Sequence, residues 1–503
     1  MADIDELIAS SMSINSRLPA QLEKALERNI VLRIGWTTSG EPVPKNGELG
    51  LCPALPDGAK VRSLGSLGPF TAAFGQGGTY THQGEAGSFL GAGNDGNKIS
   101  CEREAGNCVG YGMREGRITV LDGVGDDAGA KMQGGLLIIR GDAGLRIGGG
   151  MRDGLIVVHG DVGADPGAGM YGGRIVINGR CPSTPPGVTL RPLTKKEADE
   201  INKLLGDDDL EIPPDAVCLV SDGEPVEPIM ASCREDLSGV AIVPATTHHN
   251  PSHSTTDTVT LIGSEDALAL PIPLLPYIPE GVSDDLFHPC LVRRNPRDCD
   301  IVILDSYNLC DVPELAEKAA GFAIDLDCLP RLDGAAIDGL LVSLRSVAGP
   351  IAKTLMLRGL SQTAALHADS SHHGVEAAIS VLDDGSGLSA AAALPIVGRS
   401  ASNQLDDECP AALWLPWSAS SEDLVVLCAS NISFAISPAP DENVAGWIAS
   451  LTSSLQAQLN RLGLSSIDEL TRANLRACDQ DTGAVSGLRL AGYDRPMPHW
   501  FAR

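Results

Sequence analysis

Between residues 84 and 178, apolar and glycine positions recur every 19 residues. Each repeat ends in a short aliphatic run, and these runs cover residues 118–120, 137–139, 156–158 and 175–177. The runs are rich in β-branched side chains and only about four residues long, which favours strands over helices. A fixed short period is typical of a solenoid, in which each turn packs against its neighbours. The pattern predicts a right-handed parallel β-helix over residues 65–190.

Glycine and methionine keep the same 19-residue register. The positions are Gly87, Gly106, Gly125, Gly144 and Gly163 for glycine, and Met113, Met132, Met151 and Met170 for methionine. A glycine at a constant place in every turn indicates positive φ or a close approach to the next turn. The recurrence therefore explains the glycine-rich strings without a phosphate loop. Residues 65–83 are expected to form a degenerate turn that caps the stack, with Ala72 and Phe74 at glycine positions.

The segments on either side of the repeat predict shorter elements. Residues 1–64 form the N-terminal lead-in: Leu18, Leu22 and Ala25 share one face of a helix that ends at Asn29, and a strand follows at residues 31–34. Residues 191–238 combine a charged helix, 194–205, with a linker. The acidic run at residues 207–209 is interpreted as exposed linker charge.

From residue 239 to 503 short aliphatic runs alternate with helical patterns. The expected strands are 240–243, 258–262, 301–304, 322–324, 340–342, 354–357 and 424–427. Acidic residues follow several of them, among them Asp305 and Asp325. Buried strands alternating with helices predict an α/β domain, as a sheet or a barrel, with its sites at the carboxyl ends of the strands. A long amphipathic helix at residues 444–462 is expected to end at Gly463, followed by a capping box at Ser466.

Two segments resemble one enzyme family. The string of Gly163 and Gly167, followed by Gly172, Gly173 and the aliphatic run, resembles the GXGXG domain of the glutamate synthase large chain, and it is also similar to one of the subunits of formylmethanofuran dehydrogenase. Residues 462–470 resemble the closing segment of the glutamate synthase FMN domain. The resemblance implies that the β-helix is a spacer that holds catalytic parts apart. In that family the barrel precedes the β-helix, whereas here the order is reversed.

The resemblance also implies an FMN barrel with a glycine-rich phosphate site and a cysteine-rich loop for a 3Fe–4S cluster. Asp369, Ser370, Ser371 and Gly374 stand where the family has an aspartate, two glycines and a helix start, so they are the candidate FMN phosphate region. Serines replace both glycines, and we interpret residues 239–503 as a degenerate FMN domain. FMN therefore stays an open alternative and no cofactor is assigned. Where the cluster loop would lie, before the final helices, only Cys409 and Cys428 occur, 19 residues apart, which argues against an iron–sulfur cluster.

Histidines form two clusters whose role the sequence leaves open. They are His248, His249 and His253 in one segment, and His367, His372 and His373 in another. Imidazoles beside a carboxylate suit zinc or iron, but histidines in polar loops are more often ordinary surface residues. His288 close to Cys290 could form a nucleophilic pair, although neighbours in sequence need not face one another. We predict no metal site and assign no catalytic residue.

Composition limits the function classes further. Sixty-five acidic against 37 basic residues give a formal charge of −28, which argues against nucleic acid and anionic membranes as partners. Thirteen cysteines without metal-ligand spacing indicate free thiols in a reducing compartment. The acidic N-terminus and the absence of a long apolar stretch predict a soluble, cytoplasmic protein without a membrane span.

These observations favour a glutamate-synthase-like scaffold or ammonia-channelling component of an amidotransferase–flavoenzyme assembly in nitrogen metabolism. Its expected partners are glutaminase-type and flavin-binding subunits, or further copies of itself. Such a chain is a subunit of an oxidoreductase complex rather than a self-sufficient catalyst. Three alternatives stay open: an active FMN-dependent oxidoreductase of the glutamate synthase type, a scaffold subunit of a formylmethanofuran dehydrogenase or formyltransferase/hydrolase complex in C1 metabolism, and a stand-alone structural protein.

Overall fold

The computed structural model describes residues 4–36, 47–182, 184–206, 210–223, 236–244, 260–263, 267–282, 286–329, 332–349 and 351–493. The chain forms two compact units and passes between them more than once. Unit 1 comprises Met1–Glu227, Asp305–Glu314 and Leu329–Pro350, and unit 2 comprises Pro228–Leu304, Leu315–Cys328 and Ile351–Arg503. The expected multi-domain α/β organisation is therefore confirmed.

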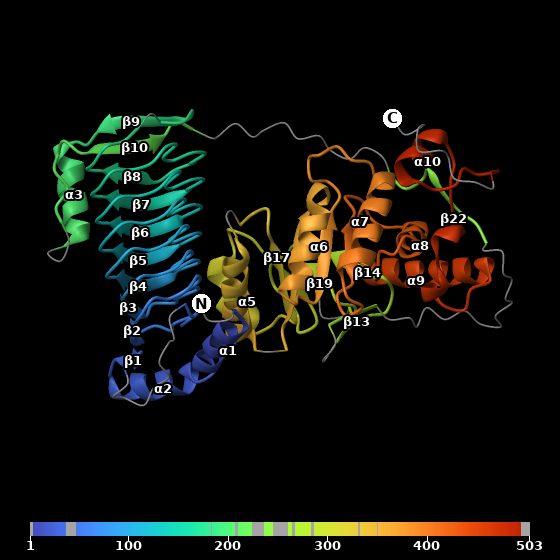
Figure 1. Ribbon diagram of the computed structural model, residues 1–503, viewed down its shortest axis with the longest axis horizontal. Coiled ribbons are helices and arrows are strands. Elements are labelled where there is room, and N and C mark those ends of the chain that lie inside the picture. Colours follow the sequence, from blue (N-terminus) through green and yellow to red (C-terminus); the bar gives the residue numbers. More distant parts are fainter. Residues whose placement is uncertain are drawn as a thin grey trace. The chain divides into compact units, whose positions relative to one another are not determined.

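Unit 1 is built on a ten-stranded sheet (Figure 1). Its strands are β1 (Leu32–Ile34), β2 (Lys60–Leu64), β3 (Thr79–Gln83), β4 (Asp95–Cys101), β5 (Glu115–Val120), β6 (Gln133–Ile139), β7 (Asp153–Val158), β8 (Arg174–Ile177), β9 (Val188–Pro192) and β10 (Val217–Ser221). Strands β1 to β7 each pair in parallel with the next strand along the chain, whereas β10 is antiparallel to both β8 and β9. We call the stacked strands β1–β8 and their connections the repeat domain.

The 19-residue period of the sequence reappears as the register of the strands. Ile118 pairs with Leu137, which pairs with Ile156, so identical positions of successive repeats lie above one another. A second series of parallel bridges joins residues of the connecting segments at the same interval: Leu67, Ala86, Ala105, Val124, Ala143 and Val162. Stacking begins before residue 65, because β1 and β2 belong to the same sheet.

The glycines of the repeat allow the coils to approach one another. At Gly84 an added Cβ atom would lie 1.7 Å from the carbonyl oxygen of Gly65, so no larger residue fits without moving the backbone. Gly91 has φ +64°, a left-handed conformation that suits glycine. The registered methionines are fully or almost fully buried, and Phe70 stacks on Phe89 with ring centroids 4.6 Å apart. The coils therefore share one continuous apolar core.

Helices cover parts of the repeat domain. α1 (Ile4–Asn15) is followed by α2 (Leu18–Arg28), which ends at Asn29 in the left-handed conformation, as predicted. α3 (Lys195–Leu205) begins with a capping box at Thr194. Its buried side chains Ile201 and Leu205 share an apolar cluster with Ile138, Val157 and Val176 on the outward side of β6–β8.

Two later segments belong to unit 1. The 3₁₀ turn η1 (Leu309–Asp311) leads into α4 (Val312–Ala316), and α5 (Gly334–Ala348) packs beside α1. Arg114 lies between two carboxylates, with Asp95 2.6 Å and Asp311 2.8 Å away. The Cys310 thiol donates to the carbonyl oxygen of Gly112 at 3.1 Å. These contacts join residues 305–314 to the repeat domain.

Unit 2 contains a closed eight-stranded barrel in which all neighbouring strands are parallel. The strands are β14 (Leu274–Tyr277), β15 (Leu291–Val292), β16 (Ile301–Leu304), β17 (Gly321–Asp325), β18 (Lys353–Gly359), β19 (Ala377–Val381), β20 (Ala411–Trp414) and β21 (Phe434–Pro438). The inward side chains form an apolar core that also includes Ile262 and Leu270 from the hairpin of β12 (Thr260–Ile262) and β13 (Leu268–Leu270). The barrel form of the α/β domain is confirmed.

Helices follow the later barrel strands, and one more helix, Gln480–Ser486, follows a strand of a small separate sheet. They are α6 (Thr363–His372, after the 3₁₀ turn Leu360–Gln362), α7 (Ala390–Gln404), α8 (Ser421–Ala429), α9 (Val444–Leu462) and α10 (Gln480–Ser486), and a small sheet pairs β11 (Val240–Ile242) with β22 (Leu475–Ala477). The predicted strands 340–342 and 424–427 are wrong, because these residues lie in α5 and α8. The capping box at Ser466 is replaced by a cap on a 3₁₀ turn, Ile467–Glu469, and a second such turn follows at Arg472–Asn474. None of the helices in the described residues is both long and apolar enough to cross a membrane.

Candidate functional site at the carboxyl ends of the barrel strands

An aromatic pair lies at the carboxyl ends of two barrel strands. Tyr277 ends β14 and Trp414 ends β20, and their ring centroids are 4.8 Å apart. Arg293, directly after β15, donates from Nε to the Tyr277 hydroxyl at 2.9 Å. Both rings pack against the barrel core. The sequence analysis missed all three residues, because they come from three separate strands and share no motif.

A cavity of about 1110 Å³ lies beside the loops that follow β19 and β20. Its lining includes the beginnings of α7, α8 and α10 and the segment that leads into β11. Five of the lining side chains are carboxylates, and none of the described lining residues is a lysine or arginine: the acids are Asp236, Glu422, Asp423, Asp479 and Asp481. We call this space the acidic cavity.

Hydrogen bonds lower the pKa of two of these carboxylates, Asp236 and Asp479. Ser238 donates to Asp236, and Thr482 donates to Asp479 from its backbone and hydroxyl, so the pKa of each aspartate is lowered. Asp423 accepts from the backbone and hydroxyl of Ser420 in the capping box of α8. The cavity is therefore anionic at neutral pH, which favours cations and disfavours phosphates.

A second cavity, of about 510 Å³, lies at the carboxyl ends of β14 and β21. Tyr277 lines it together with Glu280, Asp441 and the beginning of α9. None of its described lining residues is a lysine or arginine either. Asn443 caps α9 by accepting from the backbone N–H of Gly446, so this helix end offers one donor fewer to an anion.

The described residues that line these two cavities do not fit FMN. A flavin phosphate needs basic side chains, free helix-terminal N–H groups or glycines that permit a close backbone approach. Instead, side-chain oxygens of Ser389, Ser420 and Asn443 already accept from backbone N–H groups at the starts of α7, α8 and α9. Carboxylates line both cavities, and their charge repels a phosphate.

The candidate phosphate residues lie elsewhere. Asp369, Ser370 and Ser371 belong to the last turn of α6, and Gly374 follows it on the way into β19. The helix ends here, whereas the sequence analysis expected a helix start, so that expectation is wrong. Asp369 Oδ2 lies 3.3 Å from Nη1 of Arg358, and Ser370 is fully buried. A helix carboxyl end disfavours a phosphate.

The acidic residues at the carboxyl ends of β16 and β17 have local roles: Asp305 follows β16, and Asp325 is the last residue of β17. Asp305 accepts from the backbone N–H of Tyr307, and Asp325 accepts from the N–H groups of Asp327 and Cys328. Burial raises the pKa of Asp325. Both carboxylates therefore shape the turns that leave these strands.

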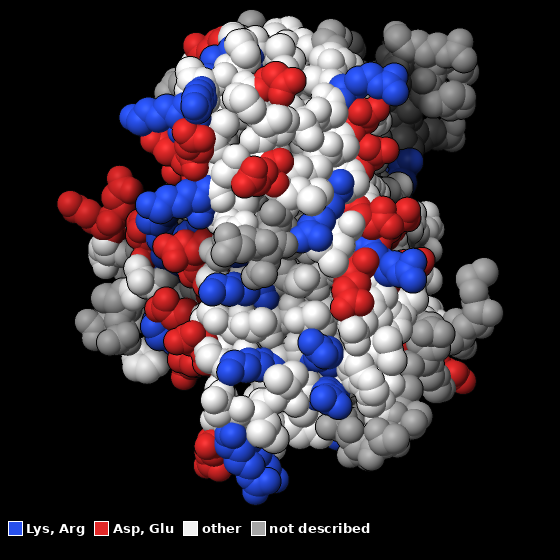
Figure 2. Space-filling view, turned by 90° about the vertical axis from the view of Figure 1, so that its left-hand side faces the viewer, with Lys and Arg blue, Asp and Glu red and all other residues white. Residues whose placement is uncertain are grey.

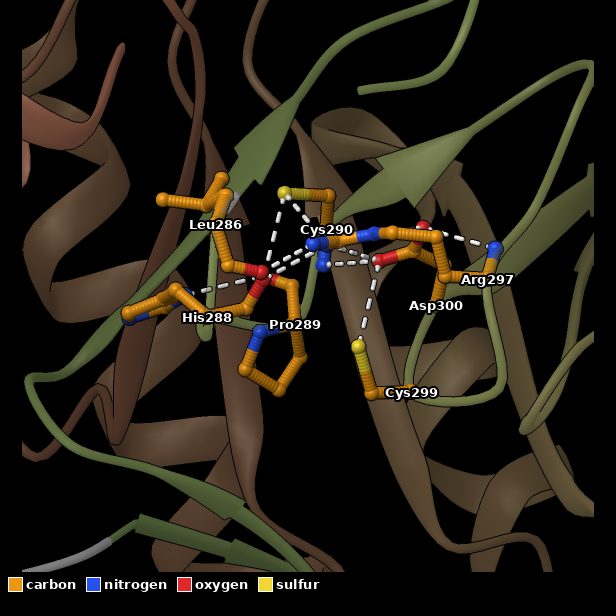
Figure 3. A network of polar contacts seen from close by, with 7 residues as sticks. All are labelled: Leu286, His288, Pro289, Cys290, Arg297, Cys299 and Asp300. Carbon is orange, nitrogen blue, oxygen red and sulfur yellow. Dashed lines mark hydrogen bonds and ion pairs between the residues drawn. The ribbon is translucent and has the colours of Figure 1, made fainter. Parts of the chain in front are cut away.

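His288 and Cys290 belong to a buried polar network before β15 and β16, at the opposite ends of the strands (Figure 3). Arg297 and Asp300 form its ion pair, and Arg297 also donates to the carbonyl oxygen of His288 at 2.8 Å. The His288 Nδ1 atom lies 2.8 Å from the carbonyl oxygen of Pro289, and the Cys290 thiol donates to the His288 carbonyl oxygen rather than to the ring. Burial raises the pKa of Cys290 to about 12. This arrangement does not activate a thiolate nucleophile.

The second histidine cluster does not converge. His367 is buried within α6, whereas the His372 and His373 rings pack edge to face at the end of the helix. The segment with His248, His249 and His253, and the acidic run 207–209, lie outside the described residues. Within the described ranges no group of three His, Cys, Asp or Glu side chains is arranged to hold a metal ion, and the cysteines are free thiols.

Comparisons with known proteins give one family match. No curated protein matches the chain. Among solved structures, the recombinant flavin-binding domain of baker's yeast flavocytochrome b2 is 11% identical, with coverage of 47% of this chain and 75% of that chain and a TM-score of 0.34. A flavocytochrome b2 variant with bound sulfite is 11% identical, with coverage of 53% and 84% and a TM-score of 0.38. Likenesses this weak carry no inference about this chain. Residues 8–197 match the protein family described as GXGXG motif.

Proposed function

We propose that this protein is a scaffold component of a glutamate-synthase-like assembly, in which the repeat domain is a right-handed parallel β-helix that spaces partner subunits. The match of residues 8–197 to the GXGXG motif family supports this kinship. The two parallel ladders, one through β1–β8 and one through the connecting segments, support the β-helix interpretation. Stacked coils with buried methionines make a stiff body suited to spacing.

One observation carries the scaffold role in preference to catalysis. The barrel keeps its closed frame, but carboxylates line the two cavities at the carboxyl ends of its strands, where FMN would need donors. The partners that follow from the kinship are a glutaminase-type subunit and a flavin-binding subunit. Ammonia released by the first would reach the second along the assembled complex, in the cytoplasm.

One experiment distinguishes this proposal from two alternative functions. An FMN-dependent oxidoreductase of the glutamate synthase type is favoured by the presence of a closed parallel barrel and a GXGXG segment on one chain. The second alternative is a scaffold subunit of a formylmethanofuran dehydrogenase or formyltransferase/hydrolase complex. Only the GXGXG segment supports it, so it ranks lower.

Purification from native cells with an affinity tag, followed by absorbance spectra and mass spectrometry, tests the proposal. We expect a colourless chain that brings down separate glutaminase-type and flavin-containing proteins. Titration of the isolated chain with FMN in a calorimeter should give no saturable heat. A yellow chain with one equivalent of FMN contradicts the scaffold role and supports the oxidoreductase, whereas C1 enzymes in the eluate support the second alternative.

A further inference from the structure

The outward side of strands β1–β4 is unusually basic for so acidic a protein. Outward side chains alternate with core side chains along each strand, so they form rows across the sheet. Leu64 and Gln83 form one of these rows, in which Gln83 donates to Glu102 at 2.9 Å. Of the other two rows, one consists of Arg33, Arg62, Thr81 and Ser100, and the other of Lys60, Thr79 and Lys98. The positions in these two rows hold basic or hydroxyl side chains and no acid, although the chain has 65 acidic and 37 basic residues. We call Arg33, Lys60, Arg62 and Lys98, all of them exposed, the basic face.

Figure 2 looks onto the side of the repeat domain that carries α3 in Figure 1. Lys and Arg side chains gather over the lower centre of this surface with few Asp or Glu side chains between them. Lys60 donates to the Asn29 side chain at 2.9 Å, a neutral partner that leaves its charge in place. The basic face therefore keeps a concentrated positive charge.

This concentration has an energetic cost. Arg33 and Arg62 occupy directly opposite positions on neighbouring strands, and like charges in such pairs destabilise a sheet. Local violations of this kind are expected where a surface serves a function. An anionic partner would remove the repulsion.

The same side of the sheet already binds one helix. Over β6–β8 the outward residues that α3 covers are apolar, and Arg174 of β8 is a charged exception in the same row as Leu155. Arg117 of β5 donates to the carbonyl oxygens of Leu204 and Leu205 at the end of that helix, at 3.2 and 2.9 Å. Towards β1 the outward residues change from apolar to basic. The same surface continues past the end of α3. A helix that binds there needs acidic side chains, whereas α3 contacts the sheet through apolar ones.

We propose that the basic face binds an acidic helix of a partner protein, laid across the strands in line with α3. Four strand spacings, from β1 to β5, span about 19 Å, which a helix covers with about 13 residues. Acidic side chains at intervals of three or four residues recur every 5–6 Å or so along the helix, close to the strand spacing of about 4.8 Å. A short helix also avoids the long-range repulsion that a charge of −28 exerts on a nucleic acid. Such a helix would belong to a partner of the proposed scaffold, but its chemistry follows from this surface alone.

Fluorescence anisotropy with the full chain tests the proposal. The probe is a labelled helical 13-residue peptide of alanine with glutamates at three- and four-residue intervals, and its matched control has glutamine in their place. We expect saturable binding of the glutamate peptide, at least tenfold tighter than that of the glutamine peptide. The triple variant Arg33→Gln/Arg62→Gln/Lys98→Gln should lose at least tenfold in affinity, while the equally neutralising Arg294→Gln/Arg461→Gln/Arg489→Gln should not.

A charge swap guards against a folding artefact. The variant Arg33→Glu/Arg62→Glu/Lys98→Glu should lose the glutamate peptide and gain a lysine peptide of the same design. Melting temperatures of the glutamine variant should equal or exceed those of the parent chain, because a repulsion is removed. Equal peptide affinity in the triple variant, or tighter binding of single-stranded DNA or phosphatidylserine vesicles than of the peptide, overturns the proposal. If no flavin-containing protein co-purifies with the chain, the proposed function fails. The peptide-binding measurement does not depend on that result.

Discussion

Arg297 and Asp300 form a buried ion pair, with 2.7 Å between the Arg297 Nη2 and Asp300 Oδ1 atoms (Figure 3). The Asp300 side chain is fully buried and also accepts from the backbone N–H of Cys290 at 2.9 Å. The pair therefore ties the start of β15 to the start of β16. Removal of either group would leave the charge of the other unpaired, so substitutions in this network should destabilise the barrel.

Replacing Asp300 with asparagine should destabilise unit 2 strongly. The Arg297 guanidinium, whose side chain is 12% exposed, would lose its counter-charge. Breaking a buried pair costs about 3–5 kcal/mol, and the lower end of that range is expected here. Urea unfolding followed by circular dichroism measures the loss. Asp298→Asn, at an exposed position next to the network, should change the free energy of unfolding by less than about 0.5 kcal/mol. Equal effects of the two substitutions would argue against a structural role for the pair.

In the repeat domain, Gly84→Ala should be among the most damaging single substitutions. The new Cβ atom would lie 1.7 Å from the Gly65 carbonyl oxygen, so neighbouring coils must separate, at a cost of about 3 kcal/mol or more. Gly169→Ala is the matched control, because Gly169 has φ +67° but open space around it. It should cost only about 1–2 kcal/mol of backbone strain. Thermal unfolding of both variants decides whether close coil contact sets the glycine register.

The buried His367 should make stability depend on pH. Burial lowers its pKa to about 4, below the value of about 6.5 in an unfolded chain. Between these values the unfolded chain binds a proton that the folded chain does not. The free energy of unfolding therefore keeps its full value, as far as His367 is concerned, above about pH 6.5. As the pH falls towards 4 it decreases by an amount on the order of 3 kcal/mol.

Comparison of variants isolates this contribution from other titrating groups. His367→Phe should flatten the decline in the free energy of unfolding between pH 7 and pH 4.5, whereas His372→Gln, at an exposed position, should leave it unchanged. Parallel pH profiles for the parent chain and His367→Phe would exclude the histidine as the cause.

Cys290 should resist alkylation in the folded protein. Its pKa is raised to about 12 by burial, so almost no thiolate exists at pH 8, and the side chain is inaccessible. Iodoacetamide labelling followed by peptide mass spectrometry should modify the exposed Cys478 within minutes and Cys290 only in urea. Rapid labelling of Cys290 in the native chain would reopen the question of a nucleophilic pair with His288.

Periodicity explains which parts of the fold the sequence predicted. The 19-residue register predicted parallel strands at that interval, because glycine and aliphatic positions repeat in every coil. The runs 340–342 and 424–427 resemble strands in sequence, because α5 and α8 are buried on nearly all sides and lack the polar face that distinguishes a helix. The barrel strand β20, with two alanines and a tryptophan, carries little β-branched signal, and it was not predicted.

The sequence did not predict which side chains meet at the candidate site. Tyr277 and Trp414 are 137 positions apart in sequence, and only closure of the barrel brings their rings together. The pairing of Asp369 with Arg358 likewise depends on how α6 packs beside β18. A resemblance to an FMN motif could therefore indicate a family but could not locate a phosphate site.

The constant register of the repeat domain has a mechanical consequence. Every coil adds one strand spacing of about 4.8 Å, so the six steps from β2 to β8 give a height of about 29 Å. Insertion or deletion of one whole 19-residue unit would change that height by a single increment without altering which side chains point outward. The number of 19-residue repeats therefore sets the height of the domain.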